Sequence, residues 1–187
     1  DGTSTAKTSA HAIGNVRSFS SNFLVVVRAF CYILTLGREG IPEAATTAVL
    51  NANYMMHKLS GHYKMAYDHT CMHEFVMSLS DLKKKTGVAA MDIAKGLLDN
   101  GIHPPTMYFP LIVDEALMVE PTESESKEEM DRFMEALVSI KRECEAIENH
   151  EDNVVVNAPH TALEVAGEWN HPYTRMQAAY PLEWISR

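Results

Sequence analysis

A short, proline-rich loop carries the residues of this sequence that are best placed for chemistry. Residues 101–106 read Gly-Ile-His-Pro-Pro-Thr, between a helical pattern and a pattern typical of a strand. Two consecutive prolines restrict the backbone, and histidine is the side chain whose charge changes near neutral pH. We therefore expect a rigid support that presents His103, Pro104 and Thr106 to a binding or catalytic site. The alternative is an exposed connection whose prolines only end the preceding helix.

Two further groups of residues have side chains that occur in metal or catalytic sites, but neither group forms a complete site. His69, Cys71 and His73 alternate, so a strand would place them on one face, and imidazole and thiolate both bind zinc. Structural zinc needs a fourth ligand, and no CxxC motif supplies it, so a sheet face of mixed polarity is favoured over a zinc module. Glu120 and Glu123 could form a carboxylate pair, although a strand end followed by a helix cap is the simpler interpretation.

Three asparagines in predicted helices are further candidates for ligand binding. Asparagine in a helix is mildly unfavourable, so Asn22, Asn51 and Asn53 could face a ligand or could be exposed. The sequence contains no GxGxxG, GxxxxGK[ST] or GxSxG motif. These residues alone predict no metal site and assemble no catalytic machinery.

The composition is that of an acidic globular protein, with 187 residues of which 46% are hydrophobic and 22% charged. The net charge of −9 argues against nucleic acid as a partner, and the basic run Lys83 to Lys85 is expected in a solvated loop. Three widely spaced cysteines favour a reducing compartment. The apolar run from Phe23 to Leu36 contains Arg28 and is shorter than the roughly 20 residues of a membrane span. We expect a cytoplasmic protein without membrane contact.

The elements that position these residues begin with two helices. Residues 16–36 are apolar nearly all round, which indicates a helix that needs cover on more than one face. Gly37 ends this helix, and Pro42 fits the first turn of a second helix that extends to about Leu59. So much apolar surface predicts a missing neighbour, or self-association in its place.

The remaining residues predict a small α/β domain, or more closely an α+β-like one. Strands are expected at 73–79, 106–109, 117–120 and 154–156, and a helix at 89–99 that Asn100 and Gly101 close. A long helix with one apolar face is expected after a capping pair, which is either Thr122 with Glu125 or Ser126 with Glu129. The order β-α-β-β-α-β describes an open-faced sandwich with two helices on one face of a sheet. From residue 158 the chain is irregular and aromatic-rich, and we expect it to lie over another surface.

Several strings of residues are long enough to be specific for a family. The strings cover 101–110 and 117–125, with 49–54, 71–76, 157–161, 171–173 and 177–182 in support. They resemble the glycine cleavage system P-protein, glycine dehydrogenase (decarboxylating), over nearly everything after Ile13. The version at 108–113 is most similar to subunit 2 of the two-subunit bacterial form.

The resemblance implies the C-terminal domain of a fold type I enzyme that uses pyridoxal phosphate. Such an enzyme decarboxylates glycine and passes the aminomethyl group to the lipoyl arm of the H-protein. The family's cofactor lysine follows Asn-Leu-His, a motif absent here, and His57-Lys58 lies in a predicted amphipathic helix. The resemblance therefore implies an inactive isolated piece without its own cofactor. It places His103, Pro104 and Thr106 near the channel for glycine and the lipoyl arm.

The resemblance also implies an organisation and a set of partners. Residues 1–15 would be a flexible leader, 16–62 a helical connection from a large domain, 63–157 the small domain and 158–187 the aromatic-rich tail. The expected partners are the large domain, the other P-protein subunit, lipoylated H-protein and glycine. A stand-alone small-molecule-sensing or interaction module with a ferredoxin-like sandwich is the alternative, because one fold serves many functions.

Overall fold

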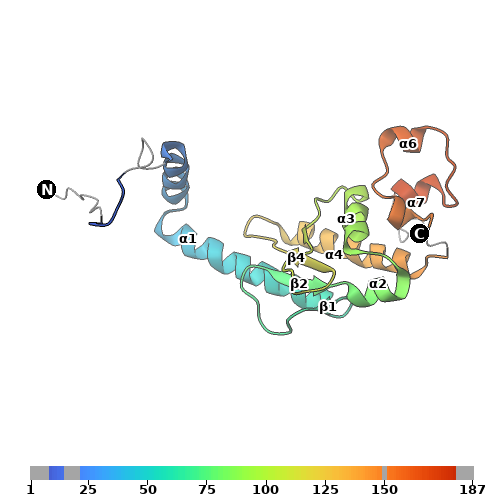
Figure 1. The fold of residues 1–187 in the computed structure, drawn as a ribbon, viewed down its shortest axis with the longest axis horizontal. Helices are drawn as coiled ribbons and strands as arrows, with labels where there is room; N and C mark the ends of the chain where they lie inside the picture. Colours follow the sequence, from blue (N-terminus) through green and yellow to red (C-terminus); the bar gives the residue numbers. More distant parts are fainter. Residues whose placement is uncertain (1–8, 15–21, 149–150, 180–187) are drawn as a thin grey trace. The chain divides into compact units, whose positions relative to one another are not determined.

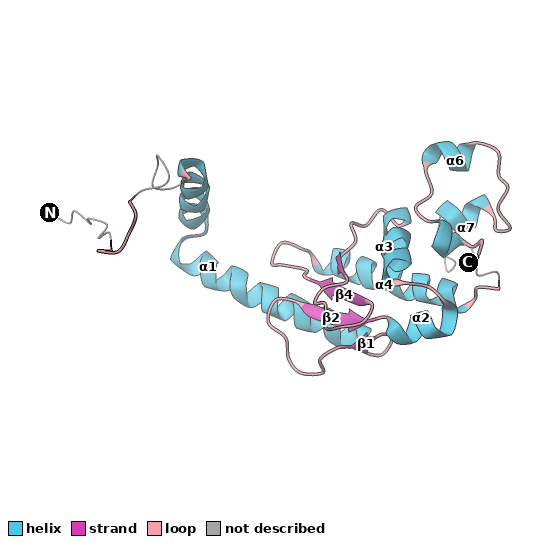
Figure 2. Cartoon of the chain, viewed as in Figure 1, coloured by secondary structure: helices cyan, strands magenta, loops and turns pink. Residues whose placement is uncertain are grey.

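The computed structural model describes residues 9–14, 22–148 and 151–179 (Figure 1). The chain divides into two units, Asp1–Pro42 and Glu43–Arg187, and helices account for most of its regular structure (Figure 2). In chain order the elements are α1 (Phe23–Leu59), β1 (Lys64–Met65), β2 (Phe75–Ser78), α2 (Ser80–Thr86), α3 (Ala90–Asp99), β3 (Thr106–Met107), β4 (Ala116–Val119), α4 (Lys127–Glu145), α5 (Val154–Asn157), α6 (Ala162–Ala166) and α7 (Arg175–Ala179).

The first unit contains the N-terminal part of α1. The helix is interrupted at Gly37, whose φ of 65° and ψ of −166° are not helical, so the predicted end of the first helix is confirmed. Before this break the large apolar side chains, among them Phe23 and Phe30, are exposed. The part of the predicted helix at residues 16–21 lies outside the described residues. Within the part of the chain that the structure describes, no helix has the length and hydropathy needed to cross a bilayer.

The second unit is built on a four-stranded antiparallel sheet in the order β1-β2-β4-β3. In the central pair, Phe75 lies opposite Val119 and Met77 lies opposite Leu117. Side chains alternate between the two faces of a strand, so these four point to the same face, and all are buried. Helical side chains complete this core: Ala52, Met55 and Leu59 from α1, Ile93 and Leu97 from α3, and Met134, Leu137 and Ile140 from α4. Removing such side chains from water is the main force that holds the unit together.

The predicted α/β class is confirmed, whereas the predicted order of elements lacks β1 and the short helices α2, α6 and α7 and is wrong at residues 154–156. The two-residue strand β1 was not predicted, and residues 154–156 form part of helix α5 instead of a last strand. The Asn153 side chain accepts hydrogen bonds from the backbone N–H groups of Val155 and Val156, at 3.1 and 2.9 Å, and so caps this short helix. Val155 is 1% exposed within the core. Capping and burial therefore outweigh the strand preference of three consecutive valines.

The start of α4 and the end of α3 agree with the sequence. Helix α4 begins after Ser126, whose hydroxyl accepts a hydrogen bond from the Glu129 N–H at 3.1 Å, so the second of the two capping pairs is the one used. Helix α3 ends at Asp99, one residue before the predicted closure at Asn100 and Gly101. Lys83 to Lys85 are exposed as expected, but they lie in α2 instead of a loop.

Candidate functional site

The backbone at the end of α3 directs the predicted loop away from the helix. Gly101 has a φ of +69°, a left-handed conformation that glycine adopts without a steric cost. The Ile102 N–H donates to the Leu97 carbonyl at 2.9 Å, which satisfies one of the free carbonyls at the helix end. At its other end the loop enters β3, where Thr106 pairs with Met118 of β4. Both ends of the loop are therefore fixed by backbone structure.

The loop forms one wall of a pocket with a volume of about 480 Å³. His103, Pro104 and Thr106 all line this pocket, together with Glu120, which follows β4, and Arg132 of α4. The structure thus brings the three sequence-predicted residues together at one concave surface, which we call the His103 pocket. Their role in a substrate channel stays a prediction.

The side chains of the His103 pocket differ in how firmly they are held. His103 is exposed, and no hydrogen-bond partner for its imidazole occurs among residues 9–14, 22–148 and 151–179. Arg132 donates to the Asn100 carbonyl at 3.1 Å and lies 3.4 Å from a Glu129 carboxylate oxygen. Glu120 lies 3.9 Å from the imidazole of His73. The donor and the acceptor of the His103 imidazole therefore remain available to a ligand.

The His103 pocket does not have the groups that hold pyridoxal phosphate. This cofactor is carried by a lysine as a Schiff base, and in the described part of the chain no lysine lines the pocket. The His57-Lys58 pair is exposed near the end of α1, where Lys58 Nζ lies 6.0 Å from the Tyr54 ring. The residues that line the His103 pocket do not by themselves fit the cofactor, and no step through it is assigned to them.

Asn51 and Asn53 hold loops in place instead of facing a ligand, whereas Asn22 is exposed just before α1. Asn51 is buried and donates to the Thr122 carbonyl at 2.9 Å. Asn53 donates to the Cys71 carbonyl at 2.8 Å and accepts from the Cys71 N–H at 3.0 Å. These contacts fix the loops before α4 and before β2 against α1, which explains why polar residues occur in that helix.

The strand that would align His69, Cys71 and His73 is not formed. All three residues lie in the loop that precedes β2, and the His69 imidazole contacts its neighbour Thr70 through the carbonyl at 3.1 Å. Among the described residues, no group of three or more His, Cys, Asp or Glu side chains is placed to hold a metal ion. The premise of a zinc module at these residues is therefore wrong.

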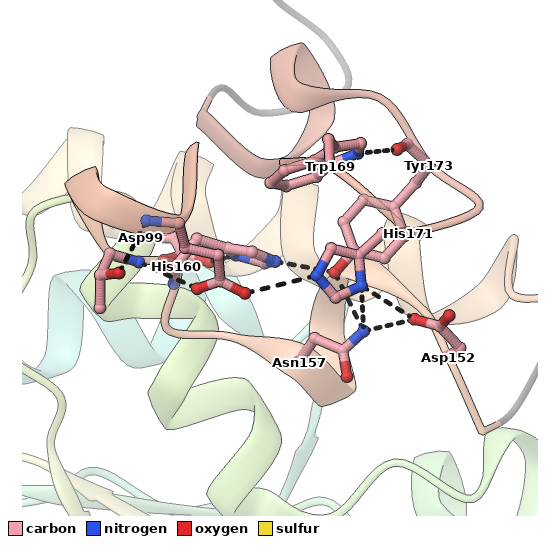
Figure 3. Close-up of polar contacts among 9 residues, drawn as sticks. Asp99, Asp152, Asn157, His160, Trp169, His171 and Tyr173 are labelled. Atoms are coloured by element: carbon pink, nitrogen blue, oxygen red, sulfur yellow. Dashed lines mark hydrogen bonds and ion pairs between the residues drawn. The ribbon is translucent and has the colours of Figure 1, made fainter. Parts of the chain in front are cut away.

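A polar and aromatic cluster that was not predicted from the sequence joins the tail to α3 (Figure 3). We call it the tail cluster; it comprises Asp99, Asp152, Asn157, His160, Glu164, Trp169, His171 and Tyr173. At its centre the His160 ring, with a side chain only 1% exposed, contacts Asp99 Oδ2 through Nδ1 at 2.7 Å and the Tyr173 hydroxyl through Nε2 at 2.9 Å. Burial raises the pKa of Asp99 and also that of Tyr173.

The hydrogen bonds around His160 define which nitrogen carries the proton. An ionised carboxylate only accepts, so Nδ1 donates to Asp99. The Asn157 amide donates to the Tyr173 oxygen at 3.0 Å, which leaves the tyrosine hydroxyl to donate to Nε2. The two ring nitrogens of His160 and the Tyr173 hydroxyl therefore each have a hydrogen-bond partner within the protein, as buried polar groups require.

The second histidine of the tail cluster lies between two acids. His171 Nδ1 is 3.2 Å from an Asp152 carboxylate oxygen, and Nε2 is 3.3 Å from a Glu164 carboxylate oxygen. Its ring stacks on Tyr173 with centroids 5.0 Å apart. The tail was expected to lie over another surface, but its described part folds on itself and against α3; residues 180–187 lie outside the described part.

Sequence comparisons were consistent with one another. The family model for the glycine dehydrogenase C-terminal domain matches residues 44–160. Probable glycine dehydrogenase (decarboxylating) subunit 2 from Treponema denticola is 61% identical over 133 residues, which are 71% of this chain and 28% of that protein. The proteins of the same name from Caldanaerobacter subterraneus and Fervidobacterium nodosum are 55% and 56% identical, each over 80% of this chain and 30% of their own length. The chain thus spans less than a third of these relatives.

A solved structure shares the fold. The crystal structure of glycine decarboxylase (P-protein) of the glycine cleavage system, in inhibitor-bound form, aligns with a TM-score of 0.57 and 20% identity. The alignment covers 66% of this chain and 28% of that one.

Proposed function

The chain belongs to the family of the glycine dehydrogenase C-terminal domain, and on that premise we propose that it forms this domain in a two-subunit P-protein. The whole enzyme would decarboxylate glycine and transfer the aminomethyl group to the lipoyl arm of the H-protein. The observation that carries the proposal is the 61% identity to a probable subunit 2. The relatives are named as subunit 2 of the enzyme, which supports a partner subunit.

In this proposal the cofactor and its lysine belong to a large domain outside the described residues. Pyridoxal phosphate would supply the electron sink for decarboxylation, and this chain would supply part of the walls around the reaction. The isolated chain should therefore form no Schiff base at a defined lysine. Mixing the purified chain with pyridoxal phosphate and borohydride, followed by peptide mapping, tests this expectation; stoichiometric labelling of one lysine would contradict it.

Within the enzyme, we assign the His103 pocket to the path that glycine and the lipoyl arm take. The rigid backbone at both ends of the loop and the available imidazole of His103 support this assignment. We expect His103→Ala in the full-length enzyme to lower the rate of glycine–bicarbonate exchange by about tenfold, the effect of one lost hydrogen bond. His57→Ala, which changes another exposed histidine, is the control. Unchanged exchange in the His103 variant would remove the pocket from the path.

The proposed organisation follows the family. Residues 16–62 would connect the small domain to the large one, residues 63–157 would form the small domain, and residues 158–187 would complete it as the tail. A cytoplasmic location is part of the proposal, and the free state of Cys31, Cys71 and Cys144 supports it. A stand-alone sensing module finds no support in these relatives, which are named as glycine dehydrogenase subunits.

A further inference from the structure

Asp99 occupies a position that is unfavourable for a carboxylate. It is the last residue of α3, where the partial negative charge of the helix end repels an anion. Burial also raises its pKa. Two donors from one residue compensate: the His160 backbone N–H and the His160 Nδ1 each lie 2.7 Å from a different Asp99 oxygen. A functional role for the contact between Asp99 and His160 would explain why an aspartate occupies this unfavourable position.

The contact lies next to the His103 loop. Asp99 is separated from Gly101, the left-handed residue that turns the chain into the loop, by Asn100 alone. The Asn100 carbonyl accepts a hydrogen bond from Arg132 of α4 at 3.1 Å. The root of the loop is therefore held on one side by α4 and on another by the tail, through His160.

The His160 side chain is itself fixed by its contacts, so that it can hold Asp99 in place. Its ring is almost completely buried, and the Tyr173 hydroxyl fixes Nε2 while Asp99 fixes Nδ1. The rings of Trp169 and His171 lie around it, with centroids 6.1 and 6.3 Å away. Figure 3 shows His160 between Asp99 and the remainder of the tail cluster. A side chain with both ring nitrogens bonded has little freedom to move without moving its partners.

We propose that His160 is a positioning residue that acts through Asp99 to fix the end of α3 and so the place of His103 in its pocket. This inference rests on the proposed function, because it gives the tail a part in shaping the glycine path. The tail cluster then does more than close the core: it sets the geometry of a loop more than 50 residues earlier in the chain.

Two substitutions separate the two ring nitrogens of His160. In His160→Asn the amide nitrogen can take the place of Nδ1 and donate to Asp99, whereas in His160→Gln it can take the place of Nε2 and leaves Asp99 without that donor. We expect amide hydrogen exchange at residues 100–108 to be about tenfold faster in the Gln variant and close to wild type in the Asn variant. Exchange at β2 is the internal control and should not change. Equal loop exchange in both variants, or a uniform increase across the whole chain, would overturn the inference.

Activity in the full-length enzyme separates this inference from the proposed function. His160→Gln should lower kcat/KM for glycine by about tenfold, and His160→Asn should restore most of it. If His103→Ala lowers activity but His160→Gln does not, the positioning role is refuted while the pocket assignment stands. If His103→Ala has no effect, the proposed function of the pocket fails, and loop exchange still decides whether His160 positions the loop.

Discussion

Replacing Gly101 with alanine isolates the backbone requirement of the His103 loop. Gly101 has a φ of +69°, and a Cβ atom built on it would find only Arg132 Nη2 at 3.7 Å, which is ordinary van der Waals contact. The substitution therefore introduces no clash, and its cost is that of a left-handed backbone. We expect Gly101→Ala to lower the free energy of unfolding by about 1–2 kcal/mol.

Gly61 provides a matched control outside any helix or strand. A Cβ atom at Gly61 meets nothing within 4 Å, and its φ lies outside the left-handed region. Alanine at such a site stabilises a protein by about 0.4–1 kcal/mol, because it restricts the unfolded chain. The two alanine variants should therefore differ by about 1.5–3 kcal/mol. Gly101→Asn should fall between them, because asparagine tolerates the left-handed region.

Equilibrium unfolding in urea measures this difference. The three variants and the wild type should have equal dependence of the unfolding free energy on urea, so that the midpoints report stability alone. If Gly101→Ala and Gly61→Ala unfold at the same midpoint, the left-handed turn does not determine the start of the loop, and the explanation given for its rigidity is wrong.

Two further predictions concern side chains that link distant segments. Asn53→Ala removes the partner of both backbone groups of Cys71 and should destabilise the second unit by about 1–3 kcal/mol, measured by the same urea titration; an unchanged midpoint would show that the loop before β2 is held by other contacts. Burial raises the folded-state pKa of Asp99 above its ordinary value of 3.8, so the stability that its protonation adds is fully present below pH 3.8 and is lost as the pH rises through the folded-state pKa. As the pH is lowered from 7 to 4, the free energy of unfolding of the wild type should therefore rise relative to that of Asp99→Asn. A constant difference in unfolding free energy between the two proteins would contradict the raised pKa.

The sequence predicted those parts of the fold that depend on neighbouring residues. The apolar spacing of α4, the Ser126 cap and the glycines at positions 37 and 101 each act within one or two helical turns. Strand β1 could not be predicted, because its two residues form a strand only by pairing with β2. Three consecutive valines predict a strand at residues 154–156, because their sequence does not reveal that Val155 packs into the core.

The same distinction holds for the candidate sites. The His103 loop could be found because its prolines and histidine are adjacent in the sequence. The tail cluster could not, because Asp99 and His160 are 61 residues apart and meet only after the tail folds back onto α3. Parts of the tail cluster lie in the strings 157–161 and 171–173, which resemble those of a family but do not by themselves predict a contact between the two strings.

The edges of the sheet have a consequence for solubility. Both outer strands, β1 and β3, are only two residues long, so each presents few unpaired backbone groups to a second molecule. Short edge strands limit the addition of further strands from other chains. Although Leu111 and Ile112 are highly exposed, contacts between copies of this unit would join apolar side chains and would not extend a continuous β-sheet, so such associations should reverse on dilution instead of growing into fibrils.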